Sequence, residues 1–156
     1  MTIEESKNDS QDARELVAFR VADQEYCVDI MSVREIRGWT PATPLPHSAD
    51  FVSGVINLRG SVLPIVDLAR RFGLEPTEPS ARHVIIVAQI NDQLVGLLVD
   101  AVSDILTVLG ERLQPTPDVA SETAKAFVRG VMAIEDRMIR FIDLERVLPP
   151  IQVEAA

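Results

Sequence analysis

Few side chains in this chain have the chemistry that catalysis requires. Nucleophilic attack by a serine or a cysteine needs a neighbouring base, and both histidines, His47 and His83, lie outside any recognisable catalytic motif. His47 follows Pro44-Leu45-Pro46 in a polar connector, which indicates a solvated loop residue, whereas His83 opens a predicted strand. Cys27 lies within an apolar run, and we interpret it as a small buried hydrophobic residue. The sequence therefore does not favour an enzyme.

Metal and cofactor sites have no better support. Two histidines far apart in the chain and a single cysteine do not form a ligand set that spacing can identify. The sequence contains no GxxxxGK or GxGxxG segment that could hold a phosphate. Four carboxylates could be imagined as acid–base pairs, but we expect them to cap short helices at strand-to-helix junctions: Asp67, Asp100, Asp104 and Asp143. We expect no cofactor and no metal.

The charge balance and the hydropathy limit the kinds of partner. The chain has 24 Asp and Glu against 15 Lys and Arg, a formal net charge of −9, whereas nucleic-acid binding needs clustered cations. We therefore expect protein partners and no nucleic acid. One cysteine cannot form a disulfide framework, which indicates a reducing compartment.

The hydropathy also argues against membrane insertion. No apolar run approaches the roughly 18 to 20 residues that span a bilayer, and the charged N-terminus does not resemble a secretory signal. We expect a cytoplasmic protein with no direct membrane insertion, in which residues 1–14 form a disordered acidic tail.

Four β-hairpins are predicted from short runs rich in Val, Ile and Leu. Polar or Gly-bearing dipeptides separate the two runs of each pair, as hairpin turns require. The paired runs are 16–21 with 26–30, 55–58 with 62–66, 84–90 with 94–99, and 128–134 with 138–142.

The hairpins belong to an internal repeat. Residues 54–70 overlay residues 130–146 at an offset of 76, and Asp23-Gln24 overlays Asp92-Gln93 at an offset of 69. Two matches in the same order indicate a duplication. Each copy reads hairpin, short helical turn, connector, hairpin and short helix, and two hairpins with one further short strand make a small barrel. The stretch 75–80 is the predicted boundary, so barrel one covers about 16–72 and barrel two about 82–148, with strand exchange between them left open.

The segment Phe51–Leu68, with its Asn57-Leu58-Arg59-Gly60 turn, closely resembles the CheW family of chemotaxis coupling proteins. Agreement continues in three further segments, which are 25–30, 33–38 (containing Glu35-Ile36-Arg37-Gly38) and 95–105. The resemblance covers about Leu16 to Leu148. It implies an all-β, CheW-like fold in which two five-stranded SH3-like β-barrels pack around a shared core, with short helices, as a single domain over 15–150.

The resemblance also implies a function. Such proteins are non-enzymatic scaffolds that couple the cytoplasmic hairpin tips of chemoreceptors (methyl-accepting chemotaxis proteins) to the regulatory domain of the histidine kinase CheA in membrane-bound receptor arrays. The sequence shows neither the phosphotransfer and nucleotide-binding domains of the kinase nor a receiver domain. We therefore expect a stand-alone adaptor.

The receptor-binding residues that the resemblance carries over come from both repeats. They are Val33, Glu35, Ile36, Gly54, Asn57, Arg59 and Ile105. An aliphatic floor with one acid and one base would suit a coiled-coil tip, and we hypothesise that Glu35 and Arg59 pair with each other. In the alternative, Arg59 only occupies the exposed corner of a turn.

Kinase contacts are expected at the barrel ends away from the receptor surface. The candidates are Ile30 on barrel one and the connector 114–119 on barrel two, with Gln114 and Val119 as its contact residues. An ordinary surface loop is the alternative for this connector. Trp39 is expected to pack over a barrel end or, less simply, to anchor a partner.

Two other functions remain open from the sequence. The chain could serve a different CheA-type pathway, such as surface motility or development, or it could be a double barrel that binds a small ligand.

Overall fold

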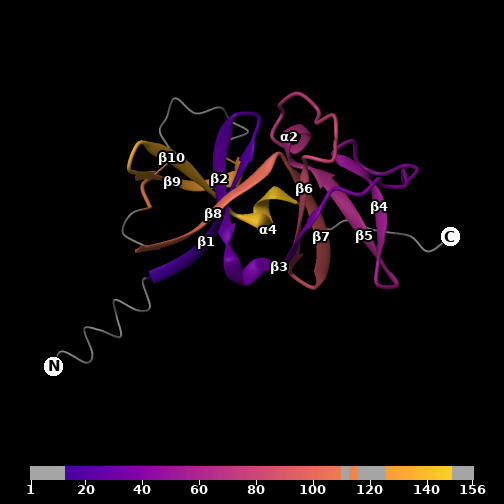
Figure 1. The fold of residues 1–156 in the computed structure, drawn as a ribbon, viewed down its shortest axis with the longest axis horizontal. Helices are drawn as coiled ribbons and strands as arrows, with labels where there is room; N and C mark the ends of the chain where they lie inside the picture. The colour runs from indigo at the N-terminus through magenta and orange to yellow at the C-terminus, as the bar shows by residue number, and fades with distance from the viewer. Residues whose placement is uncertain (1–12, 110–112, 116–125, 149–156) are drawn as a thin grey trace.

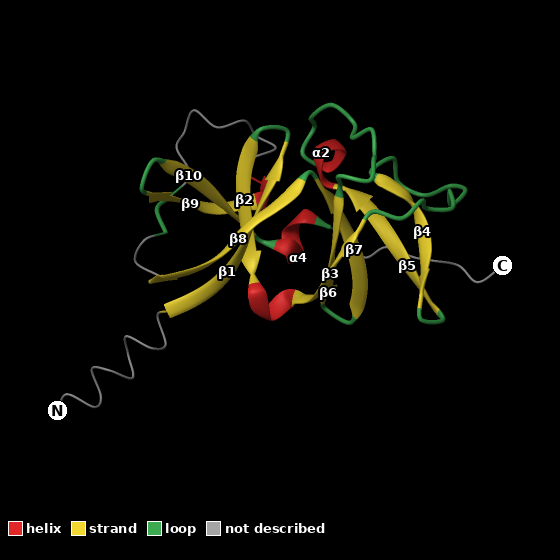
Figure 2. Cartoon of the chain, in the orientation of Figure 1, coloured by secondary structure: helices red, strands yellow, loops and turns green. Residues whose placement is uncertain are grey.

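The computed structural model describes residues 13–109, 113–115 and 126–148 and contains two five-stranded sheets. They lie side by side, and the short helix α4 lies between them (Figure 1). Strands make up most of the ribbon, and the helices are a few short turns (Figure 2). Among the described residues, no helix combines the length and the apolar character that crossing a bilayer would require.

The first sheet has the strand order β8-β1-β2-β10-β9 and the second has the order β3-β6-β7-β5-β4. The strands of the first sheet are β1 (Ala13–Val21), β2 (Gln24–Asp29), β8 (Ala101–Leu109), β9 (Val128–Ile134) and β10 (Arg137–Ile142). Those of the second are β3 (Val33–Gly38), β4 (Val52–Leu58), β5 (Ser61–Asp67), β6 (Val84–Ile90) and β7 (Gln93–Val99). The short helices are η1 (Ile30–Ser32), α2 (Leu68–Arg71) and α4 (Leu144–Val147).

All four predicted hairpins are confirmed, as β1–β2, β4–β5, β6–β7 and β9–β10. The one further strand expected in each barrel is β3 in the second sheet and β8 in the first, which the sequence analysis had not located. Both lie at sheet edges and alternate between half-buried and exposed residues. Because charged residues interrupt the apolar ones, the sequence of these strands lacks the continuous apolar run of a central strand.

The repeats exchange their first hairpins. Hairpin β1–β2 lies in the sheet that contains β8, β9 and β10, whereas hairpin β6–β7 lies in the sheet that contains β3, β4 and β5. The sheets therefore do not follow the consecutive ranges 16–72 and 82–148. Strand β1 also begins at Ala13, inside the segment expected as tail, because Ala13 and Arg14 pair with the end of β8.

Alternation along the strands separates three apolar cores. In β1, Val17 and Phe19 face the core shared by the two sheets, whereas Leu16 and Ala18 face a core lined mainly by the first sheet. The second sheet has its own core around Ile56 and Leu63, and Trp39 packs against it. This arrangement, together with the fold match reported below, confirms the predicted two-part fold around a shared core.

A guanidinium links the two halves at their shared core. Arg71 of α2 stacks over the rings of Phe51 and Phe127, which occupy equivalent positions in the two repeats, at 4.7 Å from each centroid. Its Nε also donates to the carbonyl of Val147 in α4.

Each repeat has a glycine where another segment crosses a sheet edge. A Cβ atom at Gly54 would lie 2.4 Å from the carbonyl oxygen of Thr43, and one at Gly130 would lie 2.4 Å from that of Gln114. Thr43 and Gln114 in turn make backbone bridges to Val55 and Val131. The small residues therefore allow these segments to cover the edges of β4 and β9.

The predicted caps are confirmed at two of the four aspartates. Asp67 accepts from the amide of Ala69 at the start of α2, and Asp143 accepts from the amide of Glu145 at the start of α4. The prediction is wrong for Asp100, which joins β7 to β8 and accepts from the amide of Ala22, and for Asp104, which lies inside β8.

Candidate functional site

The edge strand β3 and the β4–β5 turn meet in an ion pair. Arg59 donates from Nη2 to Oε1 of Glu35 at 2.6 Å, and Nη1 of Arg37 lies 4.0 Å from the other carboxylate oxygen. The hydrogen bond from Arg59 lowers the pKa of Glu35, with a smaller contribution from the charges of Arg59 and Arg37. The hypothesis that Glu35 and Arg59 pair is confirmed.

The turn that carries Arg59 is held by its own residues. Arg59 has a φ of +50° and Gly60 has a φ of +88°, and the Gly60 amide donates to Oδ1 of Asn57 at 2.8 Å. The Arg59 side chain is 72% exposed although it is paired. Arg59 thus occupies an exposed turn corner and also forms the ion pair.

Apolar side chains are exposed on the edge strands of both sheets. Ile36 of β3 pairs with Ile86, and Ile105 of β8 pairs with Val17, so each shares a face with a residue of the shared core. Ile36 is 43% exposed and Ile105 is 56% exposed. Both therefore present an unburied aliphatic side chain on the face of its sheet that turns toward the other half.

The remaining receptor candidates do not form one cluster with these. Val33 packs partly against the shared core, and Gly54 lies beneath Thr43. Glu35 faces the opposite side of β3 from Ile36, because its cross-strand partner is Val87, in the core of the second sheet.

The kinase candidates lie apart from one another. Ile30 begins η1, between the two sheets, and packs partly against the shared core, while its neighbour Met31 is 77% exposed. Gln114 bridges to Val131 at the edge of β9. Val119 lies outside the described residues.

One charged cluster in the first sheet escaped the sequence analysis. Arg137 of β10 makes bidentate contacts with Glu25 of β2 and with Asp104 of β8, the latter at 2.9 and 3.0 Å. The hydrogen bonds from Arg137 lower the pKa of both carboxyl groups. Because these residues lie far apart in the chain, the sequence gave no indication that they meet.

No group of three or more His, Cys, Asp or Glu side chains within the described part of the chain is arranged to hold a metal ion. Burial raises the pKa of the Cys27 thiol to about 12, which leaves this cysteine without the thiolate that nucleophilic chemistry needs.

Comparison with known proteins identifies the family. The sequence model of the CheW-like domain family matches residues 15–152. The chain belongs to the CheW family. It is 61% identical over 151 residues to "Chemotaxis protein CheW" of Rhizobium meliloti (strain 1021), with 97% of both chains covered. It is 36% identical to the protein of the same name from Klebsiella aerogenes, with 86% of this chain and 81% of that protein covered.

A solved structure supports the same assignment. The scaffolding protein TtCheW from Thermoanaerobacter tengcongensis matches the fold with a TM-score of 0.78 at 34% identity, and the match covers 86% of this chain and 91% of that one. The CheW fold and the interpretation of the chain as a non-enzymatic chemotaxis scaffold are thereby confirmed.

Proposed function

We propose that this CheW-family chain couples the cytoplasmic tips of chemoreceptors to the histidine kinase CheA in receptor arrays, where the cytoplasmic protein would be recruited. The observation that carries the proposal is the pair of exposed isoleucines, Ile36 and Ile105, on edge strands of different sheets; the Glu35–Arg59 ion pair lies on the other face of the strand that carries Ile36.

This combination suits a helical hairpin. A coiled-coil tip presents an apolar seam with charged flanks, and grooves for amphipathic helices supply apolar anchors with polar rims. Isolated exposed aliphatic residues at two sheet edges would be buried by such a partner, and a charged flank that reaches around the edge of β3 would meet the ion pair on the other face. The scaffold would then bias the kinase only if it binds the kinase states unequally.

A titration against two separate partners tests the proposal. The wild-type protein and single variants are titrated calorimetrically against a receptor hairpin-tip fragment and against the CheA regulatory domain. Ile105→Glu and Arg59→Gln are expected to weaken receptor binding by about tenfold or more, as loss of a central contact does, and to leave kinase binding unchanged. Ile30→Glu is expected to weaken kinase binding alone.

Met138→Glu is the matched control, because Met138 is 53% exposed and belongs to neither candidate surface. If Ile105→Glu and Met138→Glu weaken receptor binding equally, the receptor surface has been misplaced. If the wild-type chain binds a CheA-type kinase of another pathway and not the chemotaxis kinase, the alternative assignment to that pathway holds.

A further inference from the structure

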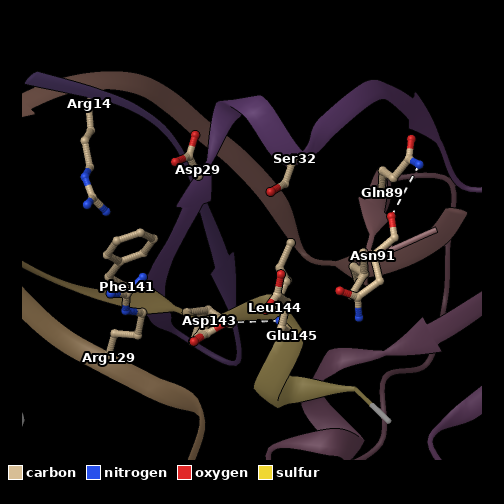
Figure 3. A pocket seen from close by; sticks show the side chains of 12 residues that line it. Arg14, Asp29, Ser32, Gln89, Asn91, Arg129, Phe141, Asp143, Leu144 and Glu145 are labelled. Atoms are coloured by element: carbon tan, nitrogen blue, oxygen red, sulfur yellow. Dashed lines mark hydrogen bonds between the residues drawn. The ribbon is translucent and has the colours of Figure 1, made fainter. Parts of the chain in front are cut away.

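The short helix η1 joins β2 directly to β3, so the kinase candidate Ile30 and the receptor candidates on β3 belong to one continuous segment. None of the three residues of η1 is buried. Two cavities adjoin it, one of about 240 Å³ lined in part by Ser32 and one of about 360 Å³ lined in part by Ile30 and Met31. Figure 3 shows the first cavity, with Gln89 of β6 across from Ser32. Shallow burial and open space beside it allow η1 to shift.

Two side chains hold η1 through the backbone of Met31. Asp29 accepts from the amide of Met31 at 2.9 Å, and Nη1 of Arg34 donates to the carbonyl oxygen of Met31 at 2.8 Å. The Nε of Arg34 also donates to Oε1 of Gln89 at 3.3 Å. Arg34 therefore ties strand β3 both to η1 and to β6.

Strand β3 is irregular at Arg34. The pairing of β3 with β6 slips by one residue between Val33 and Glu35, so Arg34 is an extra residue without a partner in β6. A bulge of this kind disrupts the ladder locally and changes the direction of a side chain. Because β3 is also an edge strand, a partner that buries Ile36 would displace Arg34 more readily than it would displace the core.

We propose that Arg34 is a positioning residue that couples the receptor surface on β3 to the kinase contact at η1. A receptor hairpin tip that covers Ile36 shifts β3, alters the contact of Arg34 with the Met31 carbonyl and thereby moves Ile30. The inference rests on the proposed function and adds to it a route by which one bound partner changes the affinity for the other. Since such coupling is reciprocal, kinase binding changes receptor affinity by the same factor.

The test measures the coupling factor, which is the ratio of the kinase-domain dissociation constants with and without a saturating receptor hairpin-tip fragment. Calorimetry on the full-length chain is expected to give a change of about fivefold or more for the wild type. Arg34→Gln removes the guanidinium and is expected to bring the change below about twofold. A merely structural role of Arg34 would lower the urea midpoint of the variant and leave the coupling factor as it is in the wild type.

The methionine methyl signals of ¹³C-methyl-labelled protein follow η1 directly. The Met31 side chain is 77% exposed, and its signal is expected to shift when the hairpin tip binds to the wild type but not when it binds to Arg34→Gln. Met138 of β10 lies in neither candidate surface and serves as the internal reference.

Arg82→Gln is the matched control, because Arg82 is an exposed arginine outside η1 and β3, and it is expected to keep the wild-type coupling factor. If the wild type binds both partners independently, or if Arg34→Gln keeps the wild-type factor, the inference is overturned and the proposed function stands. An equal shift of the Met31 signal in Arg34→Gln would also overturn it, since the receptor would then reach η1 without Arg34. If the wild-type chain binds neither partner, the proposed function fails and the inference falls with it.

Discussion

The bridge between Glu25, Arg137 and Asp104 has four hydrogen bonds, more than any other ion pair in the described part of the chain, and Arg137→Met tests how much it stabilises the fold. Arg137 joins three strands of the first sheet, since β10 neighbours β2 and β8 forms the sheet edge beyond β1. The substitution keeps most of the apolar stem but removes the guanidinium. Two carboxylates then face each other without the cation that held them.

The expected loss follows from burial. Glu25 is the more enclosed partner, with 16% of its side chain exposed, while Arg137 and Asp104 are 29% and 41% exposed. A fully exposed ion pair contributes about 0 to 1 kcal/mol, and breaking a buried one costs about 3 to 5 kcal/mol. For this half-buried, bidentate arrangement we expect a loss of about 2 kcal/mol, which for a chain of this length lowers Tm by about 4 to 8 °C.

The loss must also depend on pH. Arg137 lowers the pKa of Glu25 and Asp104 in the folded state below their ordinary values of 4.5 and 3.8. The bridge therefore stabilises the protein fully above these ordinary values, and its contribution is lost as the pH falls through the lower folded values. The difference between wild type and variant should be largest near pH 7 and should shrink below about pH 4.

Urea unfolding of both proteins at pH 7 and at pH 3 measures this difference. Arg140→Met is the matched control, because Arg140 belongs to the same strand and, among the described residues, contacts only a ring, 5.8 Å from the centroid of Tyr26. Equal losses of stability in Arg137→Met and Arg140→Met at pH 7, or a loss in Arg137→Met that does not change with pH, would show that the bridge does not stabilise the fold.

Three further predictions concern packing and reactivity. Gly130→Ala should destabilise the fold by about 2 kcal/mol, because the added Cβ would meet the carbonyl oxygen of Gln114. Gly38→Ala is the control and should be nearly neutral, because a Cβ there meets nothing within 4 Å. Equal urea midpoints for the two variants would contradict this prediction. Arg71→Leu should cost about 2 kcal/mol through its two ring contacts and one hydrogen bond, and an unchanged midpoint would show that the guanidinium does not link the halves. Cys27 should resist alkylation at pH 8 in the native state and react on unfolding; rapid labelling of the native protein would contradict its burial.

Local patterns were enough for the parts of the fold that depend on near neighbours. The hairpins followed from apolar runs separated by turn residues, and Asp67 and Asp143 were recognisable as caps since a helix start needs an acceptor within two residues. The duplication and the family resemblance were also readable, because both are properties of order along the chain. The Glu35–Arg59 pair was inferred only through the resemblance.

Pairing between distant segments was decided by the tertiary structure alone. The exchange of hairpins places β1–β2 beside β10, and no local pattern distinguishes this from pairing within one repeat, because the two repeats offer equivalent apolar strands. The contacts of Arg137 with Glu25 and of Arg71 with Phe127 depend on that exchange and on the docking of the halves. The amino-acid sequence thus determined the hairpins, the caps and the repeat through short-range preferences, whereas the three-dimensional packing selected which strands pair and which charges meet.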